Sequence, residues 1–185
     1  MELYDILQSS LSQIALSGQG ATAYLMPDIP RRLLTKAWHT FCPAEKRDQI
    51  LAVIDTSFLK NGKEGFVFTQ NTLYIKEPFH HSYQFLYKEI QAVIYLEALS
   101  TYSGKSSISM EIETQNNDFE ISNKLIKKIN SKVLNEVLQQ IISLYKPCER
   151  DETQQELKDS QTQIAHPEKF RPHEFKPDDP QIYNK

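Results

Sequence analysis

Apolar residues recur along the first part of the chain at the spacing of helices. Residues 2–17 predict an amphipathic helix, because four apolar side chains fall near one face: Leu3, Leu7, Leu11 and Ile14. A second predicted helix runs to about Phe41, with Asp28 as its N-cap between two prolines. We therefore expect two helices at the N-terminal end.

From Gln49 onward the apolar period changes to two, the period of strands. Turn signals such as Asn61-Gly62 and Asn116-Asn117 separate the apolar segments. This pattern predicts seven short strands: Ile50–Thr56, Gly65–Thr69, Thr72–Lys76, Tyr83–Tyr87, Ile90–Glu97, Ser107–Glu113 and Asp118–Ser122. Strands at hairpin spacing are typical of an antiparallel sandwich or a small barrel.

A long amphipathic helix is predicted from about Lys124 to Tyr145, with Ser122 or Asn123 as N-cap. Its core stripe consists of Ile126, Ile129, Val133, Val137, Ile141 and Leu144. A second apolar strip is displaced from this stripe and consists of Leu134, Leu138, Ile142 and Tyr145. We expect the second strip to pack against the N-terminal helices, and the alternative is an exposed partner surface that includes Leu138 and Ile142.

Three consecutive segments carry a resemblance to a known family. They are Ile54-Asp55-Thr56-Ser57, the hairpin and strand from Asn61 to Thr69, and Leu73-Tyr74-Ile75-Lys76. The chain from about 49 to 146 resembles bacterial pleckstrin-homology-like (PH-like) domains. The resemblance implies an α+β, mainly β fold: a seven-stranded antiparallel PH-like barrel or sandwich closed by a C-terminal amphipathic helix, here preceded by two N-terminal helices. The Arg-x-Arg pattern of phosphoinositide-binding members is missing after Lys60 and Lys63.

The chain is expected to have three parts. We expect an N-terminal helical extension over residues 1–48 and a tail over residues 147–185, and the resemblance implies a PH-like domain over residues 49–146. The whole net charge of −3 falls in the tail, which also holds five of the nine prolines. We expect the tail to be flexible. Phe170 and Phe175 there repeat a Phe-x-Pro pattern, typical of a short motif that docks into an apolar groove of a partner.

Composition also limits the class of protein. No apolar run approaches the roughly 20 residues of a membrane span, and the first residues lack the basic region of a signal peptide. The mildly acidic charge argues against a nucleic-acid binder. Two distant cysteines, Cys42 and Cys148, give no disulfide framework. These features together predict a cytoplasmic location.

Two groups of lysines are candidate binding residues. Lys60, Lys63 and Lys76 could bind an anion at the mouth of the barrel. Four more lysines share one arc of the predicted final helix: Lys124, Lys127, Lys128 and Lys132. Residues 97–120 carry five acidic residues against one lysine. We expect these opposite fields to pair within the chain, with a partner, or in self-association.

Signals for chemistry are weak. The adjacent His80 and His81 point in opposite directions on an extended chain, so we predict no metal site and no cofactor. His39 and Cys42 give the sole alternative of an enzyme, a hydrolase with a cysteine nucleophile. The expected function is a non-enzymatic PH-like adaptor that binds another protein. The alternative is peripheral membrane or anionic lipid-headgroup binding through the first hairpin lysines.

Overall fold

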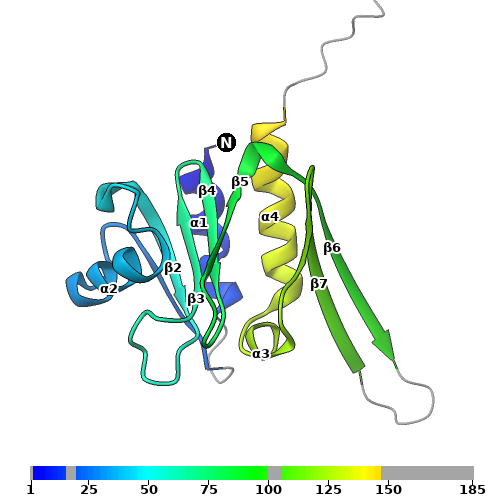
Figure 1. The fold of residues 1–185 in the computed structure, drawn as a ribbon, viewed down its shortest axis with the longest axis horizontal. Coiled ribbons are helices and arrows are strands. Elements are labelled where there is room, and N and C mark those ends of the chain that lie inside the picture. The colour runs from blue at the N-terminus through cyan, green and yellow to red at the C-terminus, as the bar shows by residue number, and fades with distance from the viewer. Residues whose placement is uncertain (1, 16–19, 100–105, 147–185) are drawn as a thin grey trace, which may run out of the picture. The chain divides into compact units, whose positions relative to one another are not determined.

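The computed structural model describes residues 2–15, 20–99 and 106–146, whose strands form two antiparallel sheets (Figure 1). The larger sheet has the order β1-β2-β3-β4-β5 and the smaller one β6-β7-β8. The strands of the larger sheet are β1 (Thr22–Leu25), β2 (Ile50–Asp55), β3 (Gly65–Thr69), β4 (Thr72–Lys76) and β5 (Ser82–Leu86). Those of the smaller sheet are β6 (Ile90–Leu99), β7 (Ser106–Thr114) and β8 (Asp118–Glu120).

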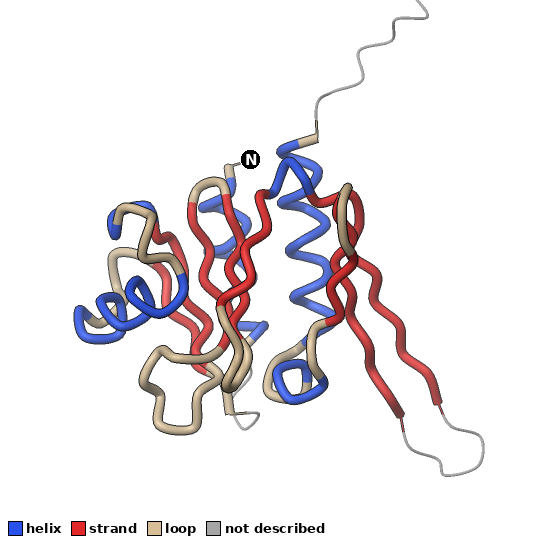
Figure 2. Tube along the Cα trace, in the orientation of Figure 1, coloured by secondary structure: helices blue, strands red, loops and turns tan. Residues whose placement is uncertain are grey.

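Helices lie on both faces of the larger sheet (Figure 2). The α-helices in the described part of the chain are α1 (Leu3–Ile14), α2 (Arg31–Phe41), α3 (Asn123–Ile126) and α4 (Ser131–Tyr145). Short 3-10 turns, η1 (Arg47–Gln49) and η2 (Tyr87–Glu89), lead into β2 and β6. Helix α4 packs against α1 and β6, while α2 covers the opposite face of the larger sheet.

The central strands are buried on both faces, which explains their continuous apolar sequence. One face contributes to the core shared with α1 and α4 through Ala52, Ile54, Phe66, Phe68, Leu73 and Ile75. The other face packs against α2 through Val53, Val67 and Tyr74. The sheet is thus the middle layer of a three-layer arrangement.

The predicted α+β class with antiparallel sheets is confirmed, and the strand count and closure need correction. Each of the seven predicted segments overlaps one of the strands β2 to β8, and β1 is an eighth strand among the described residues. β1 pairs with β2 from Thr22 opposite Asp55 to Leu25 opposite Ala52. No pairing joins the two sheets within the described residues, so a closed barrel is not formed there.

The N-terminal segment shares both the sheet and the core with the residues that follow it. β1 forms an edge of the larger sheet, and α1 packs against α4. Residues up to Lys146 accordingly form one compact unit. Asp28 is not the N-cap of α2, because the helix begins at Arg31 and Pro30 occupies the N-cap position. The tail, with Phe170 and Phe175, lies outside the described residues.

The prediction of a single final helix is wrong, because residues 127–130 interrupt the helix between α3 and α4. Asn130 caps α4 by accepting a hydrogen bond from the Val133 backbone N–H at 3.4 Å, and its own N–H donates to the Ile14 carbonyl at 2.8 Å. The second apolar strip lies in the core shared with α1. Leu138 and Ile142 are buried there, which confirms the expected packing against an N-terminal helix and makes the alternative of an exposed partner surface wrong.

Candidate functional site

The loop between β2 and β3, residues 56–64, is organised by the buried side chain of Asp55. One carboxylate oxygen, Oδ1, accepts hydrogen bonds from the Ser57 backbone N–H at 2.9 Å and from the Ser57 hydroxyl at 2.5 Å. The other oxygen, Oδ2, accepts from the Gly62 N–H at 2.9 Å. Asp55 is fully buried, so these bonds are shielded from water. A side chain at the end of β2 therefore fixes both sides of the loop.

The same loop lies closely against α2. The Ser57 hydroxyl accepts a further bond from the Asn61 N–H at 2.9 Å. Gly62 has a φ of +68°, and a Cβ there would lie 2.8 Å from the Cδ1 atom of Leu33 in α2. Glycine meets both demands of this position, the left-handed backbone and the close approach. The base of the loop is accordingly held in one conformation.

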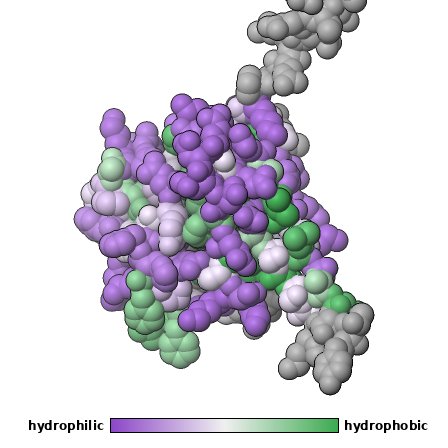
Figure 3. Space-filling view, turned by 45° about the vertical axis from the view of Figure 1, so that its right-hand side comes forward, coloured by the Kyte–Doolittle hydropathy of each residue, from purple (hydrophilic) through white to green (hydrophobic). Residues whose placement is uncertain are grey.

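Large apolar side chains project from the tip of this loop and from a neighbouring one. Phe58 is 94% exposed, Leu59 is 74% exposed, and Phe79 between β4 and β5 is fully exposed. Because β2 to β5 form an antiparallel meander, the loops 56–64 and 77–81 lie at the same end of the sheet (Figure 1), here called the loop end. Figure 3 shows apolar side chains projecting at this lower edge of the molecule. Exposed apolar clusters of this kind mark interaction sites.

The three lysines of the predicted anion site all lie at the loop end, but they do not share one pocket. The Lys60 ammonium donates to the Gly20 carbonyl, and that of Lys76 donates to the His80 carbonyl. Lys63 is exposed. Of the three, Lys60 alone lines a cavity described below. The structure thus places these cations around the exposed apolar residues.

The acidic neighbours of these lysines are engaged elsewhere. Glu64 forms an ion pair with Lys128 at 3.5 Å, and the Lys128 ammonium also donates to the Thr56 carbonyl at 2.7 Å. The Glu77 carboxylate accepts from the Ser122 N–H at 2.8 Å. The charge of Glu64 is therefore offset by Lys128, whereas Glu77 keeps its negative charge beside Lys76.

The predicted arc of four lysines is divided by the break in the final helix. Lys124 lies in α3, Lys127 caps the C-terminal end of α3, Lys128 lies in the connection, and Lys132 lies in α4. Lys128–Glu64 is the one ion pair among the described residues. The expected pairing of these lysines with the acidic segment 97–120 is therefore not formed within the described part of the chain.

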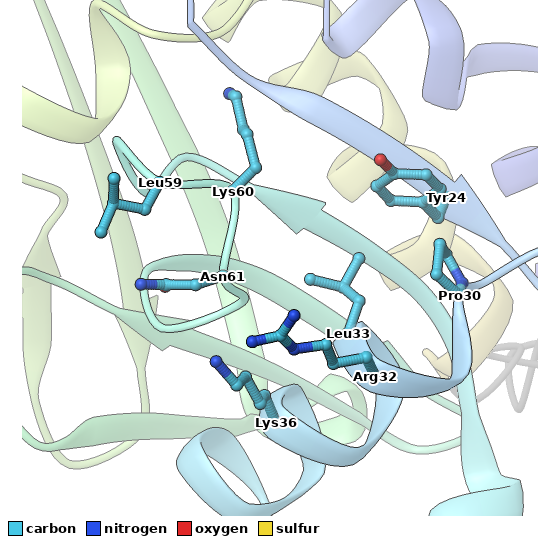
Figure 4. A pocket seen from close by; sticks show the side chains of 8 residues that line it. All are labelled: Tyr24, Pro30, Arg32, Leu33, Lys36, Leu59, Lys60 and Asn61. Carbon is cyan, nitrogen blue, oxygen red and sulfur yellow. The ribbon is translucent and has the colours of Figure 1, made fainter.

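A cavity of about 380 Å³ opens between α2 and the loop tip (Figure 4). Tyr24, Pro30, Arg32, Leu33, Lys36, Leu59, Lys60 and Asn61 line it. Three of these side chains are cationic and none is acidic. Sequence reasoning missed Arg32 and Lys36, although their spacing of four residues puts both on one face of α2.

The residues considered for catalysis are Cys42 and His39, and those considered for metal binding are His80 and His81. Burial, with a smaller effect of Glu45, raises the pKa of the Cys42 thiol to about 12. A thiol with this pKa is protonated and unreactive at neutral pH. His39 packs against Trp38, with ring centroids 4.4 Å apart. The described residues contain no cluster of His, Cys, Asp and Glu suited to a metal ion, His80 and His81 included.

Two further observations concern the chain as a whole. None of the helices in the described ranges has the length and apolar character needed to span a bilayer. No family model, curated protein or solved structure matches this chain.

Proposed function

We propose that this protein is a non-enzymatic binding domain that attaches peripherally to an anionic lipid surface through its loop end. The observation that carries the proposal is the exposure of Phe58 and Leu59 on a loop held by Asp55 and flanked by Lys60 and Lys63. Apolar side chains enter the interface of a bilayer, and lysines beside them contact anionic headgroups. A loop fixed before binding loses little conformational entropy on docking.

The expected binding energy can be worked out from these residues. Full burial of a phenylalanine and a leucine contributes about 1.5–3 kcal/mol each. Each lysine near an anionic surface contributes about 1 kcal/mol. Phe58 and Leu59 with Lys60 and Lys63 thus supply roughly 5–8 kcal/mol before the cost of association. Because the apolar pair supplies the larger share and salt screens only the lysines, added salt should weaken the binding without abolishing it.

The order of the strands and of the final helix supports the proposal that this chain is a PH-like domain. Four antiparallel strands, β2 to β5, precede three, β6 to β8, and the helix α4 follows them. This is the element order that the resemblance implies for residues 49–146. We propose on this ground that the chain is a PH-like domain with β1, α1 and α2 added.

Vesicle flotation tests the proposal. The protein should float with phosphatidylserine–phosphatidylcholine vesicles and remain unbound with phosphatidylcholine alone. The double variant Phe58→Ser/Leu59→Ser should bind about 100-fold more weakly, from the loss of about 3 kcal/mol or more. The matched control is Leu144→Ser, because Leu144 is partly exposed at the end of α4 that contacts the opposite end of the sheet.

Charge reversal gives an independent test of the same proposal. Lys60→Glu/Lys63→Glu should weaken binding at least about tenfold, by removing about 2 kcal/mol of attraction and adding repulsion. Lys88→Glu is the control, since Lys88 lies exposed in η2 at the opposite end. Equal flotation of all four variants and the original protein would contradict membrane docking by the loop end.

A protein partner is the second candidate function. Leu96 and Leu99 are 60% and 70% exposed on β6, which is an edge strand within the described residues. An exposed apolar edge strand is a site for pairing with another chain. Affinity purification from the native host should recover a partner that Leu96→Lys loses. A partner retained by that variant would argue against this edge.

A further inference from the structure

We infer that the cavity between α2 and the loop tip binds a phosphate monoester carried on a small organic group. The inference adds a ligand to the proposed membrane docking, and it rests on that function only where the ligand is part of a lipid. The cavity is lined by Tyr24 and by residues of α2 and loop 56–64.

The charge of the cavity favours an anion of more than one negative charge. Arg32 and Lys36 project from one face of α2 (Figure 4). The Lys60 ammonium on the facing loop points away from them and donates to the Gly20 carbonyl. No acidic side chain lines the cavity to offset the charges of Arg32 and Lys36. Like charges on one face repel each other, and an anion placed beside both relieves that repulsion. A phosphate monoester, with about −1.5 to −2 charge at neutral pH, fits this arrangement.

The donors present also suit a phosphate. The planar guanidinium of Arg32 can donate two parallel hydrogen bonds to phosphate oxygens, and the ammonium group of Lys36 acts as a point charge on the same helix face. The cavity volume of about 380 Å³ is at the small end of the roughly 300–1,000 Å³ range of ligand sites. The ligand is accordingly a phosphate with a small organic group.

Two probes carry such a phosphate monoester on a small glycerol group. They are glycerol 3-phosphate in solution and phosphatidic acid in a membrane, where the same phosphate is attached to a diacylglycerol.

The N-terminal segment is essential to this site. Tyr24 comes from β1, and Arg32 and Lys36 come from α2, all before residue 49. The resemblance to PH-like domains covers residues 49–146, so it does not assign this cavity. The site exists because α2 packs beside the loop, with Gly62 against Leu33.

Calorimetry with glycerol 3-phosphate and flotation with phosphatidic acid vesicles test the inference. We expect binding of the soluble compound, or stronger flotation with phosphatidic acid than with phosphatidylserine at equal content, or both. Arg32→Gln/Lys36→Gln should weaken this binding at least tenfold. Arg31→Gln is the matched control, because Arg31 is exposed on the same helix and does not line the cavity. Circular dichroism establishes that each variant is folded.

The outcomes separate this inference from the proposed membrane docking. Phe58→Ser/Leu59→Ser should no longer bind vesicles of either anionic lipid, and it should still bind glycerol 3-phosphate. The inference is overturned if the soluble compound does not bind and the two anionic lipids are bound equally. It is also overturned if Arg32→Gln/Lys36→Gln binds these probes as tightly as Arg31→Gln does.

Discussion

Replacement of Asp55 by asparagine tests whether one buried side chain fixes the loop that carries Phe58 and Leu59. The amide oxygen of Asp55→Asn can keep the two bonds from Ser57. The amide nitrogen then faces the Gly62 N–H, which loses its acceptor. A buried donor without a partner costs about 1–3 kcal/mol. Asp55→Ala removes all three bonds and should cost about 3–5 kcal/mol.

Urea unfolding and amide hydrogen exchange measure these effects at two scales. Unfolding gives the free energy for residues 1–146, and exchange at Gly62 and Ser57 reports the loop itself. We expect faster exchange at both amides and weaker flotation with anionic vesicles. Asp28→Asn is the control, since Asp28 is exposed. If Asp55→Asn has an unchanged urea midpoint and unchanged Gly62 exchange, the role given to Asp55 is refuted.

Three further predictions concern the base of the loop and the core. Gly65 has a φ of +126°, and a Cβ there would lie 2.0 Å from the Ile54 carbonyl oxygen. Gly65→Ala should therefore lower the free energy of unfolding, measured by urea titration, by about 2 kcal/mol or more. Gly20→Ala should lower it less, because the space around Gly20 is open. Lys128→Met loses the bond to Thr56 and should cost about 1 kcal/mol relative to the exposed Lys127→Met, measured by thermal unfolding. The Cys42 thiol should resist a thiol reagent at pH 8 in folded Cys148→Ser protein and react once urea unfolds it. Because the thiol pKa is 9.0 unfolded and about 12 folded, its contribution to stability is complete below pH 9 and declines as the pH rises to about 12. Cys42→Ala should show a shallower decline, and an equal slope would contradict the burial of the thiol.

Local patterns predicted most strands of the larger sheet and failed where pairing decides the structure. β3 and β4 are recognisable because they are apolar on both faces. β1 has four half-buried residues between a glycine and a proline, and it becomes a strand only through its pairing with β2. A register shift between Ile90 and Ala92 lets both Ile90 and Val93 be buried, and a strict period of two cannot reveal such a bulge.

The candidate site was predictable in part for similar reasons. Lys60, Lys63 and Lys76 stand beside hairpin signals, so their position at one end of the sheet follows from the strand order. Arg32 and Lys36 join them only through the packing of α2 beside the loop, which no local pattern contains. Phe58 and Leu59 have the composition of core residues, and their exposure follows from the way Asp55 holds the loop.

A fluorescent probe at residue 58 tests the central claim that the loop end enters the membrane surface. Phe58→Cys in Cys148→Ser protein would carry an environment-sensitive dye, because Cys42 is buried and unreactive. With phosphatidylserine vesicles, we predict a blue shift and quenching by nitroxide groups on the acyl chains. The same dye at Leu144→Cys should stay in water. An unshifted, unquenched dye at residue 58, or equal quenching at both positions, would contradict docking through the loop end.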